Sequence, residues 1–161
     1  MKAYLLALEI QEVEVGRLYS SLPLHCTLVH WFWTDDSKKL LTVIESILET
    51  LPAPTLFVEG EEEFTGNTKS GPIGVKVNKV TKTQRLATLH ETIAILLEEA
   101  GVIYVMPQYI HEGYVPHVTH QQEARLNKGD KAQVSSVYLV DADAPEYGNE
   151  RKVIHKFNFK A

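Results

Sequence analysis

The chain has 161 residues, of which 44% are hydrophobic and 23% charged, an ordinary composition for a folded protein that excludes a disordered chain. The formal net charge of -5 argues against non-specific binding of long nucleic acids, because that mode needs many Lys and Arg side chains to release counterions from phosphates. A small ligand with one or two phosphates remains compatible with this charge.

The predicted elements follow an α+β order, with strands on both sides of two helices. Strands are expected at 2–9, 24–33, 55–59, 73–80, 114–120, 134–141 and 151–159, and helices at 37–50 and 82–100. The stretch 11–21 is ambiguous and could be a short helix. The stretch 60–71 contains three consecutive glutamates and is interpreted as an acidic, solvated loop around Phe64. A further loop is expected at 142–150.

Cellular location is indicated by the cysteine content and by the apolar runs. Cys26 is the single cysteine, which excludes an internal disulfide and indicates a reducing compartment. Glu9 and Glu12 follow the first apolar run where a signal peptide would have small neutral residues. No apolar run approaches the roughly 18 residues needed to cross a bilayer. We therefore expect a cytoplasmic monomer without a membrane partner.

Two of the predicted strands carry the same short motif. His25 and Thr27 lie two residues apart in one strand, and His117 and Thr119 do so in another. Since side chains alternate along a strand, each histidine and its threonine share one face. Two imidazoles and two hydroxyl groups on similar strands predict a pocket for one phosphate.

The paired His-x-Thr strands, with a helix ending at Gly101 between them and an aromatic strand 156–159 near the end, resemble the 2H phosphoesterase superfamily. This superfamily includes bacterial 2′-5′ RNA ligase-like proteins and cyclic nucleotide phosphodiesterases. The resemblance covers nearly the whole chain. It implies one bilobal, pseudo-symmetric α+β domain over 1–161, in which two antiparallel sheets face a central cleft and the helices lie outside.

The resemblance also implies roles for the four motif residues. His25 and His117 would be the acid and base, and Thr27 and Thr119 would bind the phosphate. Histidine suits both roles, because its pKa near 6.5 allows one ring to be neutral and the other protonated near neutral pH. This arrangement requires neither metal nor cofactor, and the symmetry of the motifs leaves open which histidine is the acid. His120 stands where an aliphatic residue is common in the family, and its alternate spacing predicts that it faces away from the cleft.

The expected function is hydrolysis of a phosphodiester in a small RNA-derived or cyclic nucleotide, such as a 2′,3′-cyclic phosphate or a 2′-5′ linkage. The alternatives are a nucleotide-binding module without turnover and 2′-5′ ligation by the reverse reaction. Trp31, Tyr114 and Phe64 are candidates to stack on a base, although core packing is an equal alternative for each. The partner would then be a small nucleotide or an RNA end, and long duplexes are excluded.

Three other chemistries are less favoured. A metal site would have to combine residues of the segment His111, Glu112, His117, His120 and Glu123. His120 and His117 are an odd number of residues apart, so on a strand their side chains point to opposite faces. A glycine and a proline between His111 and His117 also interrupt the regular spacing that a metal site would need. Cys26 faces away from His25 and is interpreted as a buried side chain rather than a nucleophile. His90 lies beside the apolar stripe of its helix and is expected to be packed and hydrogen-bonded.

Overall fold

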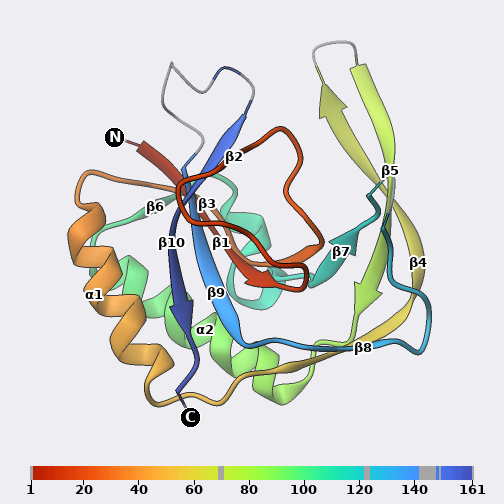
Figure 1. Ribbon diagram of the computed structural model, residues 1–161. Helices are drawn as coiled ribbons and strands as arrows, with labels where there is room; N and C mark the ends of the chain where they lie inside the picture. Colours follow the sequence, from red (N-terminus) through yellow and green to blue (C-terminus); the bar gives the residue numbers. More distant parts are fainter. Residues whose placement is uncertain (1, 69–70, 122–123, 142–147, 149, 161) are drawn as a thin grey trace.

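The protein has an α+β fold of antiparallel strands with two helices, as expected (Figure 1). The computed structural model describes residues 2–68, 71–121, 124–141, 148 and 150–160. The helices are α1 (Ser37–Leu48) and α2 (Gln84–Glu99), and two 3-10 turns are η1 (Pro107–Tyr109) and η2 (His111–Gly113). The strands are β1 (Lys2–Glu9), β2 (Leu18–Tyr19), β3 (His25–Thr34), β4 (Thr55–Thr68), β5 (Gly71–Val80), β6 (Ile103–Tyr104), β7 (His117–Thr119), β8 (Lys131–Gln133), β9 (Ser136–Asp141) and β10 (Arg151–Asn158). Among these described residues, neither helix has the length and apolar character that a membrane span requires.

The strands form one hydrogen-bonded path in the order β2-β10-β9-β1-β3-β7-β5-β4-β8, with β6 attached to β3. Every pairing along it is antiparallel. We call β2, β10, β9, β1 and β3 the first half-sheet, and β7, β5, β4 and β8 the second half-sheet. In Figure 1 the β4–β5 hairpin extends on the right, away from the first half-sheet on the left. The two halves meet where the motif strands β3 and β7 pair.

Both helices pack on one face of the first half-sheet. Asp36 caps α1 by accepting a hydrogen bond from the Lys39 amide (3.1 Å), and Thr83 caps α2 through the Leu86 amide (3.2 Å). The apolar side chains at helical spacing are buried between the helices and the strands. Burial of each such leucine or isoleucine contributes about 1.5–3 kcal/mol, so the helices fix the back of the motif strand β3.

The opposite face of the first half-sheet is covered by the segment 11–24, which does not form the short helix considered from the sequence. Val13 and Leu22 of this segment pack on a second apolar cluster that includes Tyr138. Glu9 anchors it, because its carboxylate accepts a hydrogen bond from the Val13 amide (3.0 Å) and pairs with Lys156 Nζ (2.6 Å). The chain is therefore held against the sheet by a largely buried ion pair rather than by helical hydrogen bonds.

The predicted acidic loop at 60–71 is wrong, because β4 continues to Thr68 and pairs with β5 from Val58 onward. Strand alternation sends the three consecutive glutamates to different faces, which removes much of their mutual repulsion. Glu62 also lies 3.5 Å from Lys79 on the neighbouring strand. A run of like charge was thus compatible with a strand once the partner strand supplied lysines.

Smaller differences concern the second half of the chain. The apolar stretch 102–109 forms the two-residue strand β6 and the turn η1, and β8 was not anticipated. Most of the expected loop 142–150 lies outside the described residues.

Candidate active site

The two His-x-Thr motifs are neighbours in the sheet. Cys26 of β3 pairs with Val118 of β7. Continuing this antiparallel register places His25 beside Thr119, and His117 beside Thr27. The four side chains therefore share one face, which we call the motif face, and each is partly exposed.

The register also sets the spacing of the two histidines. They are diagonal neighbours, and diagonal positions on adjacent antiparallel strands lie about 7–8 Å apart. A positive charge on His117 also lowers the pKa of His25. The two rings therefore lie near each other, diagonally across the joint between β3 and β7.

Both imidazoles are oriented by the same local contact. His25 Nδ1 lies 2.8 Å from the Pro23 carbonyl oxygen, and His117 Nδ1 lies 2.9 Å from that of Val115. A carbonyl oxygen can only accept, so each Nδ1 carries the hydrogen and donates it. Each ring consequently keeps Nε2 for exchange of a proton with a ligand.

Burial lowers the pKa of both histidines. For His25, desolvation is the largest cause, and the charges of His117 and Arg151 lower the pKa further. For His117, desolvation again dominates. Both rings are therefore mainly neutral at pH 7, and binding an anionic group between them would favour protonation of one ring.

The side chains between each histidine and threonine point to the opposite side, as predicted. Cys26 and Val118 are completely buried. Burial raises the pKa of the Cys26 thiol to about 12, so this residue is not a thiolate nucleophile at neutral pH.

Tyr114 was predicted as a possible stacking residue, and the structure places it elsewhere. Its side chain is only 4% exposed and lies behind the motif strands, where its ring stacks on His90 at 4.0 Å. Its hydroxyl donates to the carbonyl oxygen of Thr27 (2.8 Å). The ring therefore supports β3 from the core and has no face available for a ligand.

His90 is the packed residue that the sequence suggested. It donates from Nδ1 to the Leu28 carbonyl oxygen (2.7 Å), and its Nε2 accepts from the His111 amide (3.0 Å). Leu28 lies at a bulge, where the β1–β3 register shifts, and such a residue leaves part of the ladder unpaired. His90 and Tyr114 together satisfy two successive carbonyl groups of β3 beside the motif.

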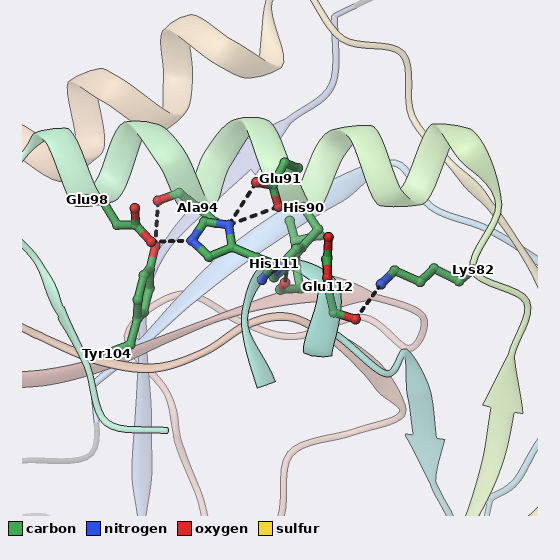
Figure 2. Close-up of polar contacts among 9 residues, drawn as sticks. Lys82, His90, Glu91, Ala94, Glu98, Tyr104, His111 and Glu112 are labelled. Carbon is green, nitrogen blue, oxygen red and sulfur yellow. Dashed lines mark hydrogen bonds and ion pairs between the residues drawn. The ribbon is translucent and has the colours of Figure 1, made fainter. Parts of the chain in front are cut away.

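His111 connects this support to the surface of α2 (Figure 2). Its Nδ1 contacts both carboxylate oxygens of Glu91 (2.8 and 2.9 Å), and its Nε2 contacts Glu98. Glu91 is the largest cause that raises the pKa of His111, and Glu98 adds to it. Figure 2 shows the ring between these two carboxylates, so the protonated imidazole ties η2 to α2.

Phe64 and Trp31 both lie on the motif face. The Phe64 ring meets that of His117 edge to face, with 4.8 Å between centroids. Trp31 is partly buried against the cluster under segment 11–24. Sequence reasoning gave no role to His30, although its pKa is lowered by burial and by the charge of His117.

The residues considered for a metal site do not converge. His111 uses both ring nitrogens on carboxylates of α2, whereas His120 lies 3.8 Å from Glu61. That contact is on the face opposite His117, as strand parity predicted. Glu123 is outside the described residues. Within the described ranges, no three His, Cys, Asp or Glu side chains are grouped to hold a metal ion.

Comparison with known proteins agrees with this geometry. Residues 6–142 match the model of the 2′-5′ RNA ligase superfamily. The chain belongs to that superfamily. No curated protein matches it significantly in sequence.

Solved structures show the same fold at low identity. TT0787 of Thermus thermophilus is 16% identical, has a TM-score of 0.61, and is matched over 99% of this chain and 98% of that chain. E. coli LigT complexed with 3′-AMP is 13% identical, with a TM-score of 0.59 and 99% of each chain covered. A protein described as a phosphoesterase is 12% identical, with a TM-score of 0.56 and all of both chains covered. The 2H phosphoesterase resemblance is thereby confirmed at the level of family and fold, and this 2′-5′ RNA ligase superfamily member has a 2H phosphoesterase-like function.

Proposed function

We propose that the protein is a metal-independent phosphodiesterase that acts on a small RNA-derived or cyclic nucleotide. The observation that carries the proposal is the register of β3 and β7, which sets two imidazoles with the same Nδ1 anchor diagonally across one face. The neutral ring removes a proton from the attacking water or hydroxyl group at Nε2. The protonated ring donates a proton to the leaving oxygen. After one turnover the two rings have exchanged protonation states.

The threonines complete the arrangement. Thr27 is beside His117 and Thr119 is beside His25 in the register, so each hydroxyl can donate to a non-bridging phosphate oxygen while the imidazoles lie in line with the reacting bonds. The E. coli LigT structures with 3′-AMP and with phosphate support a ligand of this class. Hydrolysis of a 2′,3′-cyclic phosphate and cleavage of a 2′-5′ linkage both fit, and 2′-5′ ligation is the same chemistry reversed.

The test is turnover of 2′,3′-cyclic nucleotides and 2′-5′ dinucleotides with a chelator present. His25→Ala and His117→Ala should each lower kcat by about 10²-fold or more, because each removes a general acid or base. His155→Ala is the matched control, since that ring packs on Phe157 and not on the motif histidines. Circular dichroism should show all three variants folded.

The outcomes separate the candidate functions. Unchanged turnover in either motif variant contradicts the mechanism. Calorimetric binding of an intact nucleotide with no product at any pH identifies a binding module. Joining of a cyclic phosphate end to a hydroxyl end, without hydrolysis, identifies a ligase.

The pH dependence supplies a second check. Because burial lowers the pKa of both histidines, kcat/KM should peak below about pH 6.5, the ordinary histidine pKa, and fall at higher pH as the protonated ring is lost. An optimum well above that pH would contradict the assignment.

A further inference from the structure

A cation and an aromatic ring lie together on the first half-sheet, away from the motif threonines. The guanidinium of Arg151, the first residue of β10, lies 5.5 Å from the centroid of the Trp31 ring. Arg151 also pairs in the sheet with Tyr19 of β2. Throughout the described ranges no carboxylate forms an ion pair with Arg151. In a chain with net charge -5, this guanidinium is a local positive charge that no described carboxylate neutralises.

This pair is on the reactive side of the sheet. Val153, two residues after Arg151, belongs to the apolar cluster opposite the helices, and Trp31 packs against that same cluster. Alternation along β10 gives Arg151 the same face as Val153. The charge of Arg151 also lowers the pKa of His25, which places the two groups within electrostatic reach.

The indole of Trp31 nevertheless lies too far along β3 to contact the reacting phosphate. Trp31 follows Thr27 by four residues on β3, which at about 3.3 Å per residue corresponds to about 13 Å along the strand. Whatever contacts Trp31 must therefore be a part of the ligand beyond the phosphate held between the histidines. The guanidinium group of an arginine can bind a phosphate by donating two parallel hydrogen bonds. The indole ring of a tryptophan can stack on a nucleotide base.

We propose that Arg151 and Trp31 form a subsite for a second phosphate and an adjoining base of the substrate. This inference rests on the proposed function and narrows its substrate class. The preferred substrate is a dinucleotide, or a nucleotide that carries a phosphate in addition to the reacting one. A 2′,3′-cyclic mononucleotide without a second phosphate can place its base on Trp31 but leaves Arg151 without a phosphate to bind.

The test compares calorimetric binding of adenosine 2′-monophosphate and adenosine 2′,5′-bisphosphate. Wild-type protein should bind the bisphosphate at least about 10-fold more tightly, because hydrogen bonds to charged groups contribute about 1.5–3 kcal/mol. Arg151→Gln should bring the ratio of the two affinities close to 1. The charge of Arg151 also lowers the pKa of His25, but an effect on that histidine acts on the motif phosphate of both ligands and leaves their ratio unchanged. Trp31→Leu should weaken both ligands by about 10-fold, as expected for a lost stacking surface.

Arg85→Gln is the matched control, because it removes the same charge from α2, on the helix side of the molecule. Arg151→Lys keeps the positive charge but cannot donate two parallel hydrogen bonds, so it should retain only part of the preference for the bisphosphate. Equal wild-type affinity for both ligands, or equal losses in Arg85→Gln and Arg151→Gln, overturns the subsite. Binding is measured without turnover, so the two hypotheses can fail separately. A wild-type protein that shows no turnover but still prefers the bisphosphate would contradict the proposed enzymatic function and support the subsite.

Discussion

Tyr114→Phe tests whether the core holds the first motif strand in place. The hydroxyl of Tyr114 donates to the Thr27 carbonyl oxygen at 2.8 Å, and the residue is 4% exposed. Phenylalanine keeps the ring and its 4.0 Å stack on His90 but lacks the donor. The substitution therefore removes the hydrogen bond to the peptide that follows a predicted phosphate-binding residue, together with the weaker 3.9 Å contact of the same hydroxyl with Cys26 Sγ.

The magnitude follows from burial. A typical hydrogen bond contributes about 0.5–1.5 kcal/mol, and leaving a buried acceptor without its partner costs about 1–3 kcal/mol. Water cannot replace the hydroxyl easily, because Cys26 and Tyr114 are both buried here. We expect the free energy of unfolding to fall by about 1–3 kcal/mol. We also expect kcat to fall more than KM rises, because the Thr27 hydroxyl loses its fixed position.

Urea denaturation with an unchanged m-value measures the first effect, and steady-state kinetics measures the second. Tyr109→Phe is the control, since Tyr109 lies in the same connecting segment but is 43% exposed. A loss of stability below about 0.5 kcal/mol in Tyr114→Phe, or equal losses in both variants, would refute the assignment of this hydrogen bond as a support of β3.

Three further predictions concern groups around the site. His111→Gln should lower the unfolding free energy most at acidic pH. Glu91 raises the pKa of His111, so the ion pair stabilises the fold below about pH 6.5 and is lost as the pH rises through the raised pKa. Urea denaturation at about pH 6 and about pH 9 should show the larger difference from wild type at the lower pH. Phe64→Leu should lower kcat/KM by about 2- to 10-fold through loss of the ring contact with His117, and unchanged kinetics would exclude that contact from the site. Glu9→Gln leaves the amine of its lysine partner buried without a carboxylate, so the unfolding free energy should fall by about 3–5 kcal/mol, and protection of the segment 11–24 from proteolysis should fall with it; a stability equal to wild type would disprove the anchor. Because the pKa of Glu9 is lowered, its contribution should be present above about pH 4.3 and vanish as the pH falls through the lowered pKa.

The motif strands could be predicted because their signal is local. Alternation along a strand is enough to put His25 and Thr27 on one side and Cys26 on the other, and the structure agrees. The helix α2 was similarly clear, since its apolar stripe, the cap at Thr83 and the stop at Gly101 all coincide. Family, fold class and the positions of these elements followed from such features.

Other features depended on pairing between distant segments. The strand character of 60–68 becomes visible only when β5 is opposite, because cross-strand lysines offset the glutamates. Tyr114 could not be assigned from the sequence, since an aromatic residue before a motif is equally compatible with a ligand-binding face or the core. Two register shifts between β1 and β3 turn Val29 toward the helices, whereas simple alternation along the strand would place it with His25. Arg151 carried no local motif, and only the sheet brings it beside Trp31.

The joint between β3 and β7 has a mechanical consequence. One residue pair, Cys26 with Val118, connects the two half-sheets at this point, and each half contributes one histidine. Behind this joint one apolar core continues from Cys26 and Leu28 of β3 to Leu56 and Val80 of the second half-sheet, so a rotation between the halves would disturb that core. The spacing of the two imidazoles therefore depends on the packing behind both half-sheets as well as on the one strand pair that joins them.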